Sequence, residues 1–225
     1  GLDRGKIGDG VVVKFIKSGN KILLLQPNQK YRANTENDLE KKSIEQAFAK
    51  SVLFGFPIKE TMGSTYVIDI TPFLLLDAHG VANRLKKKKE GIYKLDSSRN
   101  TLWLENTKAF PKNIEFEALL TLVGQPTGKN IEKIATNVNS ISVIQHHSFM
   151  ELTDNKYQPR DFDTRCGSYP MEYMDYATPI WQPIKKRFIY RHRLEKINPE
   201  AEKSKAIEPI IYYLDPGTPE PIRSA

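Results

Sequence analysis

Four histidines are the first side chains in this sequence that could do chemistry, because imidazole is a common zinc ligand and general base. They are His79, His146, His147 and His192. A zinc-binding helix needs two histidines at positions i and i+4 with a glutamate beside the first, and no pair has that spacing. His146 and His147 are adjacent in a predicted strand, so their side chains should point to opposite faces and not bind one ion together. We therefore predict surface or hydrogen-bonded histidines and no metal ligands.

The single cysteine, Cys166, is the next candidate. It has no second cysteine to pair with, so an internal disulfide is excluded. The neighbouring Arg165 would lower the pKa of the thiol and favour the reactive thiolate. A hydrolase that uses Cys166 with a histidine is one hypothesis, but a lone cysteine is usually a small buried or inert side chain. No Gly-x-Ser-x-Gly sequence marks a nucleophilic serine.

Phosphate-binding and carboxylate patterns are also weak. The segment from Gly124 to Lys129 is one residue short of a Walker motif and is followed by Asn130, so it predicts a hairpin turn. Glu115 and Glu117 share one face of a predicted strand, where an exposed polar face is the usual arrangement. The residue types and spacings therefore predict no catalytic centre and no cofactor site in this chain.

The composition indicates a folded protein. Its 225 residues are 39% hydrophobic and 27% charged, which suits one large domain or two small ones. No apolar run approaches the roughly 18 residues needed to cross a bilayer. The net charge of +7 is spread along the chain except for clusters at 86–89 and 185–196, and neither cluster matches a nucleic-acid-binding motif. We therefore expect no transmembrane segment and no nucleic-acid partner.

The elements that would position these residues are mostly strands. Apolar and polar residues alternate most cleanly over 114–122, with the period of a half-buried strand. The other predicted strands are 11–15, 22–25, 66–70, 101–104, 141–152 and 187–194, while 157–183 is predicted to be irregular. Helical spacing predicts one helix over 35–52 and another from Thr71 to the lysines at 86–89, weakened or broken at Gly80. The pattern predicts an α+β fold, mainly antiparallel β-sheet with two helices.

The last part of the chain has a different pattern. Residues 197–208 contain Pro199 and several charges, and they are predicted to be a linker after an N-terminal domain of residues 1–196. The next stretch, 209–215, is apolar on both faces, which is typical of a central strand buried on both sides. The pattern therefore predicts that residues 209–225 are the start of a second, truncated domain.

Several short motifs, taken together, resemble a known family. They are Gly1-Leu2-Asp3-Arg4-Gly5, Leu74-Leu75-Leu76-Asp77-Ala78-His79-Gly80-Val81, Lys108-Ala109-Phe110-Pro111-Lys112-Asn113, Gln145-His146-His147-Ser148-Phe149, Met174-Asp175-Tyr176-Ala177-Thr178-Pro179, Lys186-Arg187-Phe188-Ile189, Arg191-His192-Arg193-Leu194 and the segment from Pro209 to Arg223. In this order they are similar to the region that precedes the catalytic domain in large bacterial zinc-dependent metallopeptidases of the metzincin type.

The resemblance implies a non-catalytic accessory or propeptide-like domain that scaffolds, inhibits or guides peptide substrate to its own catalytic domain. It also implies that the zinc-binding helix, His-Glu-x-x-His-x-x-Gly-x-x-His, lies beyond Ala225. Residues 209–225 would supply the first strand of the metzincin sheet and the start of its first helix. This chain alone would be inactive and hold no zinc, whereas the full-length protein would be a zinc peptidase. A periplasmic, outer-envelope or secreted location is implied as well.

The resemblance also points to particular residues. Thr164-Arg165-Cys166-Gly167 is similar to the Arg-Cys-Gly core of the cysteine switch in matrix metallopeptidase propeptides, so Cys166 is a candidate zinc latch. Other motif residues give a candidate functional surface. These are His79, His146, His147, Asp175 and Tyr176.

A stand-alone module that binds a polymer, either a glycan or a peptide, is the main alternative. The aromatic residues Trp103, Trp181, Tyr169, Tyr173 and Tyr176 could form a platform for sugar rings or peptide side chains. Such residues more often pack in a core or against a loop. A natural stop after Ala225 would favour this alternative, and an in-frame zinc helix would favour the peptidase.

Overall fold

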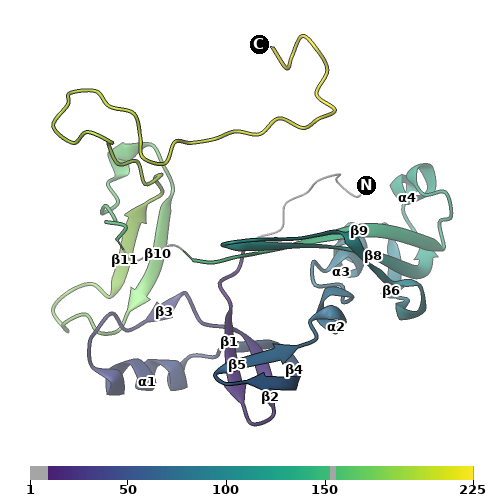
Figure 1. Ribbon diagram of the computed structural model, residues 1–225, viewed down its shortest axis with the longest axis horizontal. Helices are drawn as coiled ribbons and strands as arrows, with labels where there is room; N and C mark the ends of the chain where they lie inside the picture. The colour runs from purple at the N-terminus through teal and green to yellow at the C-terminus, as the bar shows by residue number, and fades with distance from the viewer. Residues whose placement is uncertain (1–9, 153–155, 225) are drawn as a thin grey trace. The chain divides into compact units, whose positions relative to one another are not determined.

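The computed structural model describes residues 10–152 and 156–224. It divides the chain into two compact units, which are described separately (Figure 1). Unit 1 comprises Gly1–Gln29 and Lys41–Thr153, and unit 2 comprises Lys30–Glu40 and Asp154–Ala225. Antiparallel strand pairs with a few short helices dominate the structure, so the predicted α+β fold is confirmed.

The first sheet of unit 1 has the strand order β1-β2-β4-β5. Its strands are β1 (Lys14–Ser18), β2 (Lys21–Gln26), β4 (Ser51–Met62) and β5 (Thr65–Ile68). β1 and β2 form the predicted hairpin, in which Ser18 pairs with Lys21. Gly19 lies in the turn at φ 57, a conformation that glycine adopts without strain. Leu24 and Phe56 are buried on this sheet.

The second sheet of unit 1 is built around one long strand. Its strands are β6 (Gly91–Leu95), β7 (Thr101–Phe110), β8 (Asn113–Pro126) and β9 (Ser140–Met150). β9 pairs along one edge of β8, while β6 and β7 share the other edge. Because alternate residues of β8 point to opposite faces, Ala118, Leu120 and Leu122 are fully buried together. The alternation predicted over 114–122 is therefore confirmed at these three positions, whereas Ile114 is 41% exposed and Thr121 is buried at 4%.

Short helices lie beside this second sheet (Figure 1), and residues of α3 and α4 pack into its core. They are α2 (Thr71–Leu74), α3 (Val81–Lys87) and α4 (Lys129–Ile134), and η1 (Ser97–Arg99) is a single turn between β6 and β7. Val81, Leu85 and Ile131 from the helices form one core cluster with Tyr93 and Leu122 of the sheet. Burial of each large apolar side chain stabilises the fold by about 2 kcal/mol.

The helices depart from the prediction in number and length, because four short ones replace the two expected. The helix predicted from Thr71 is divided into α2, which ends at Leu74, and α3, which begins directly after Gly80. The φ of 64 at Gly80 lies in the left-handed region. The helix predicted over 35–52 is α1 (Asp38–Ala47), which has no buried residue. Val52 lies in β4 instead, because it pairs with Leu25 of β2.

Unit 2 contains a three-stranded sheet with the order β11-β10-β3. Its elements are β3 (Tyr31–Arg32), η2 (Thr164–Cys166), β10 (Pro170–Asp175) and β11 (Lys185–Ile189). β10 therefore occupies part of the stretch predicted to be irregular. Among the residues of unit 2 that the structure describes, Asp175 is buried, at 5% exposure, and no apolar residue is. In this part of the chain unit 2 thus lacks an apolar core like that of unit 1.

The predicted C-terminal strand is not formed. Residues 209–214 have no strand partner in the described ranges, and Tyr212 and Tyr213 are 86% and 87% exposed. Main-chain groups form a strand only when a neighbouring strand supplies their hydrogen bonds, and none lies along this segment there. The Gly1-to-Gly5 motif lies outside the residues that the structure describes.

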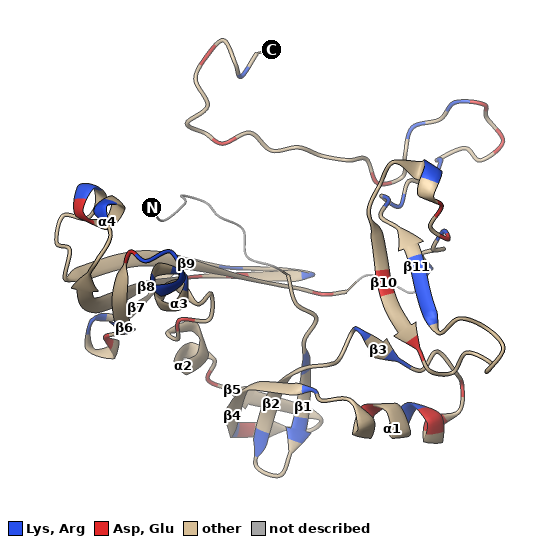
Figure 2. Ribbon diagram, turned by 180° about the vertical axis from the view of Figure 1, so that it is seen from behind, with Lys and Arg blue, Asp and Glu red and all other residues tan. Residues whose placement is uncertain are grey.

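The two basic clusters belong to different units (Figure 2). The lysines at 86–89 lie at the end of α3 in unit 1, and Lys185 opens β11 in unit 2. Glu172 of β10 pairs with both Lys185 and Arg187, at 2.7 and 2.8 Å. No helix in the described part of the chain is long and apolar enough to span a membrane.

Candidate functional site

The loop between α2 and α3, residues 75–80, is hydrogen-bonded to β9 in unit 1. Gln145 of β9 is 3% exposed, and its amide Nε2 donates to the carbonyl oxygens of Leu76 and Leu74 at 2.9 and 3.3 Å. Its Oε1 accepts from the His79 main-chain N–H at 3.4 Å. The His79 Nε2 lies 3.1 Å from the carbonyl oxygen of His146. The structure therefore brings two of the candidate histidines together at the edge of β9.

His147, the third candidate histidine, is buried beneath the same loop at 8% exposure. Its Nε2 lies 2.7 Å from Nε2 of Gln145, and its ring centre lies 5.7 and 5.3 Å from those of Phe73 and His79. Burial, followed by the charge of His79, lowers the pKa of His147 from 6.5 to about 4, although a hydrogen bond with the Leu74 main chain opposes the shift. At neutral pH the imidazole is therefore uncharged.

His146 points to the other, open face of β9, as its position next to His147 predicted. Its Nε2 lies 2.6 Å from Oε2 of Glu115, and its Nδ1 lies 3.4 Å from Oε1 of Glu117. Ser148 Oγ donates to Oε1 of Glu115 at 2.7 Å. Burial raises the pKa of Glu115, but hydrogen bonds from Ser148 and His146 outweigh it and hold that pKa below its ordinary value. The polar face predicted for Glu115 and Glu117 is thus a connected network.

An irregularity in β7 completes this network. Trp103 pairs with Glu117 and Lys108 with Glu115, so residues 104–107 of β7 stand opposite a single residue of β8. The excursion places Asn106 Nδ2 2.6 Å from Oε2 of Glu117. Bulges commonly redirect side chains in this way. Each carboxylate therefore already accepts hydrogen bonds from its own sheet, which stabilises this half-buried polar face.

The remaining surface candidates, Asp175 and Tyr176, belong to unit 2. Asp175 Oδ1 accepts from the main-chain N–H groups of Asn34 and Ala177, at 3.0 and 3.1 Å. Tyr176 is 43% exposed, and its ring centre lies 6.3 Å from that of Tyr31. Asp175 therefore ties the chain after β3 to the end of β10, which is a structural role.

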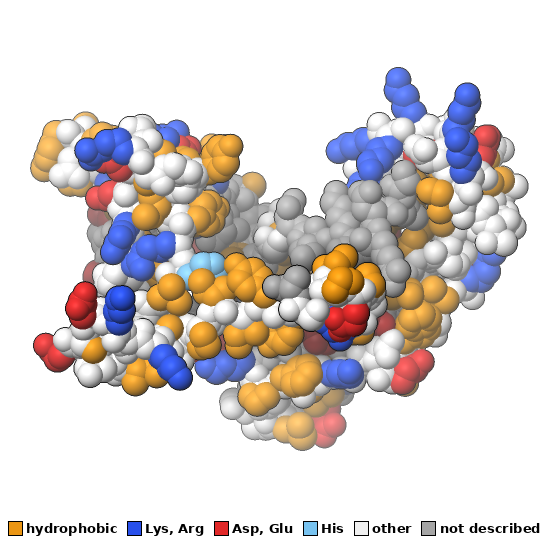
Figure 3. All heavy atoms as spheres, turned by 90° about the horizontal axis from the view of Figure 1, so that it is seen from above, with side chains coloured by type: hydrophobic (Ala, Val, Ile, Leu, Met, Phe, Trp, Pro, Cys, Tyr) orange, Lys and Arg blue, Asp and Glu red, His pale blue; other side chains and the backbone are white. Residues whose placement is uncertain are grey.

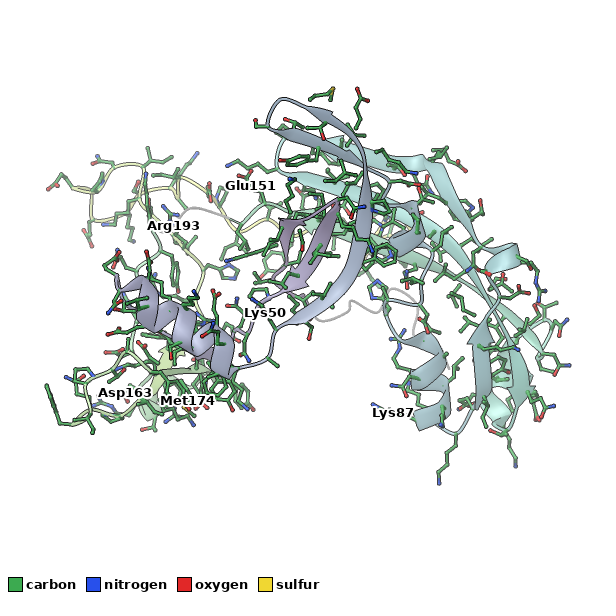
Figure 4. The ribbon with its side chains drawn as sticks, turned by 90° about the horizontal axis from the view of Figure 1, so that it is seen from below. Lys50, Lys87, Glu151, Asp163, Met174 and Arg193 are labelled. Carbon is green, nitrogen blue, oxygen red and sulfur yellow. The ribbon has the colours of Figure 1, made fainter. Side chains whose placement is uncertain are left out.

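Cys166 is exposed at the end of η2 and forms no disulfide. Its Sγ lies 3.3 Å from Oγ of Ser168, and this hydrogen bond is the main cause of the lowered pKa of the thiol. The prediction that Arg165 lowers this pKa is wrong, although the pKa is lowered. The Arg165 guanidinium instead binds the Asp163 carboxylate at 2.6 Å. Asp163, labelled in Figure 4, also caps η2 by accepting from the Arg165 main-chain N–H.

Residues 10–152 and 156–224 contain no group of three or more histidine, cysteine, aspartate or glutamate side chains placed to hold a metal ion. The side chains of these ranges therefore do not fit a zinc site.

The sequence matches one family model over residues 5–197, which is most of the 225-residue chain. That model is a domain of unknown function, DUF5117. The chain belongs to the DUF5117 family. The candidate residues from His79 to Tyr176 lie inside the matched region, and the apolar segment 209–214 lies after it. No curated protein and no solved structure matches this DUF5117 chain.

Sequence reasoning missed two residues that organise this DUF5117 domain. Gln145 stands in one of the sequence motifs without an assigned role, yet its amide connects the loop before α3 to His147. No sequence pattern marks Asn106, because its contact with Glu117 depends on a bulge in β7. A buried amide on the apolar face of a strand is the one signal that could have singled out Gln145, since such a group needs several partners.

Proposed function

We propose that this DUF5117 chain is a non-catalytic domain that docks onto the catalytic domain of a zinc-dependent metallopeptidase. There it would serve as a scaffold, guide peptide substrate or restrain activity. The observation that supports the proposal is the uncovered apolar segment 209–214 in unit 2. The resemblance of the motifs to the region before metzincin catalytic domains names the kind of partner.

The segment has the composition of a strand that is covered on both sides. In an extended chain Ile210, Tyr212 and Leu214 face one side, and Ile211 and Tyr213 face the other. All five are between 43% and 87% exposed in this chain. Hydrophobic side chains also lie open to solvent elsewhere on the surface (Figure 3). Burial would stabilise each large side chain by about 1.5–3 kcal/mol, so a partner sheet with both faces covered would bind the segment favourably.

The test is to express the protein that the whole gene encodes and to measure its zinc content and its peptidase activity on a denatured protein substrate. The proposal predicts about one zinc per complete protein, activity that a chelator removes, and neither property in residues 1–225 alone. A gene that ends at Ala225, or a complete protein without zinc, would contradict it.

Cys166 has a definite place in this proposal as a zinc latch. Its thiol is exposed and its pKa is lowered, so a zinc ion with an open position would find a ready thiolate. In the complete protein, Cys166→Ser should raise peptidase activity before any cleavage of the domain. Equal latency of the wild type and Cys166→Ser would remove the latch while leaving the docking proposal intact.

Polymer binding is the second candidate function, and two exposed aromatic residues of unit 2 favour it. Tyr169 is 89% exposed and Trp181 is 80% exposed. Exposed aromatic rings are common anchors for sugars and peptides. Binding of residues 1–225 to immobilised glycans or peptides, lost in Trp181→Ala but kept in Trp103→Phe, would support this candidate. No binding to either polymer would reject it.

A further inference from the structure

Residues 75–80 are here called the clasp loop. The hydrogen bonds between β9 and the clasp loop require one protonation state of the His147 ring. The amide nitrogen of Gln145 must face the carbonyl oxygens of Leu74 and Leu76, since a carbonyl accepts only from a donor. The same nitrogen lies 2.7 Å from Nε2 of His147. An amide nitrogen does not accept a hydrogen bond, so that ring nitrogen carries a lone pair and no proton. One of the two amide hydrogens is then shared between His147 and the more distant Leu74 oxygen.

Proton binding to His147 conflicts with this arrangement, although a hydrogen bond with the Leu74 main chain favours the charged ring. A proton on Nε2 would face the donor group of Gln145, so two donors would meet at hydrogen-bond distance. The imidazolium would also be buried at 8% exposure with the ring of His79 5.3 Å away. Turning the Gln145 amide to accept the proton would remove the donor that holds Leu74 and Leu76.

Other charged groups near His147 do not relieve the conflict. His146 lies beside it but points to the opposite face, where Glu115 and Glu117 hold it. Asp77 of the clasp loop is occupied, because its carboxylate oxygens accept from the first main-chain N–H groups of α3 at 2.7 and 2.9 Å. The rings nearest His147 on its buried side include the uncharged Phe73.

We infer that the clasp loop is an acid-released cover on strand β9, which opens when His147 takes up a proton from solvent. Proton uptake breaks the contact between Gln145 and His147, and with it the hydrogen bonds from Gln145 to the loop. The bond from His79 to the carbonyl oxygen of His146 is then lost as the loop leaves. Opening exposes that main-chain oxygen at the outer edge of β9, where an added strand could bind. This inference does not depend on the proposed docking function.

The size of the effect follows from the two protonation states of His147. With a pKa of about 4 in the closed loop and about 6.5 once exposed, opening should become on the order of 20-fold more favourable between pH 7 and pH 5. The readout is amide hydrogen exchange of residues 75–80 in the intact chain, corrected for the intrinsic dependence of exchange on pH. Protection of these amides should fall by that factor, while protection of β2 should stay constant.

The decisive comparison uses one variant and one matched control. His147→Gln keeps a hydrogen-bonding group but cannot titrate, so protection of the clasp loop should no longer depend on pH. His192→Gln, an exposed histidine of unit 2, should keep the wild-type response. Equal protection at both pH values in the wild type, or an undiminished response in His147→Gln, would overturn the inference. If His147→Gln does not fold, NMR titration of the wild-type protein tests the inference instead. The chemical shifts of the His147 ring and of the clasp-loop amides should then change with the same pH midpoint, and different midpoints would overturn the inference.

Discussion

At the scale of single residues, the adjacent histidines of β9 show how strand geometry sets chemistry. His146 lies on the open face between two carboxylates, and His147 lies on the buried face against Gln145. Two neighbouring positions in one strand therefore hold an exposed imidazole paired with carboxylates and a buried, neutral imidazole. Both environments follow from the alternation of side chains in a strand.

Burial of neutral His147 should make the stability of unit 1 depend on pH. The unfolded chain binds a proton near pH 6.5, whereas the native state binds it only near 4, so stability is lost as pH falls from 6.5 towards 4. The full loss attributable to this group is about 3 kcal/mol. Urea unfolding of wild type and His147→Gln at pH 7, 5.5 and 4.5 measures it. The wild type should lose more stability than the variant over this range, and parallel losses would show that His147 is not the cause.

The Cys166 thiol should react with iodoacetamide at a lower pH than an ordinary cysteine. Its hydrogen bond with Ser168 stabilises the thiolate and lowers its pKa. In Ser168→Ala the midpoint of the rate–pH profile should move upward, while Arg165→Gln should change it less because that guanidinium is held by Asp163. A profile that Ser168→Ala leaves unchanged would assign the shift to another group.

At the scale of elements, the second sheet of unit 1 depends on close approach between β6 and β8. A Cβ atom on Gly124 would lie 2.0 Å from the Ile92 carbonyl oxygen and 2.7 Å from Cα of Tyr93. Main-chain atoms of a neighbouring strand cannot move aside as the end of a flexible side chain can. Glycine is therefore required at this position by packing, not by its backbone angles.

Gly124→Ala should destabilise unit 1 by about 2–3 kcal/mol, because it forces β6 away from β8. Gly10→Ala is the matched control, since its added Cβ would meet nothing within 4 Å, and it should change stability by less than about 0.5 kcal/mol. Thermal unfolding followed by far-ultraviolet circular dichroism compares the two. Similar melting temperatures for both variants would contradict the close approach.

The elements also show what could be predicted from the sequence. The β1–β2 hairpin, the alternation along β8 and the break at Gly80 were predictable, because each depends on neighbours in the sequence. The helix predicted over 35–52 extended too far, because Val52 pairs with Leu25 of β2, a contact that no local pattern encodes. The network around Glu117 could not be predicted for the same reason, since it joins side chains from three strands.

At the scale of the whole chain, the two units differ in how they are stabilised. Unit 1 buries leucine, isoleucine and phenylalanine side chains in its sheets and helices, whereas no apolar residue is buried in the described part of unit 2. A unit held mainly by hydrogen bonds and ion pairs has little resistance to local unfolding. We therefore expect the main-chain amides of β10 and β11 to exchange with solvent faster than those of β8 and β9, in amide exchange measured on residues 1–225. Slower exchange in β10 would indicate that unit 2 is stable without a partner.

Docking through residues 209–214 is tested most directly by their amide exchange in two samples, residues 1–225 alone and the complete protein encoded by the gene. In the chain alone these amides have no strand partner in the described structure and should exchange near the unprotected rate. In the complete protein they should exchange at least about tenfold more slowly, because an added strand gains main-chain hydrogen bonds. Equally fast exchange in both samples would contradict docking through this segment.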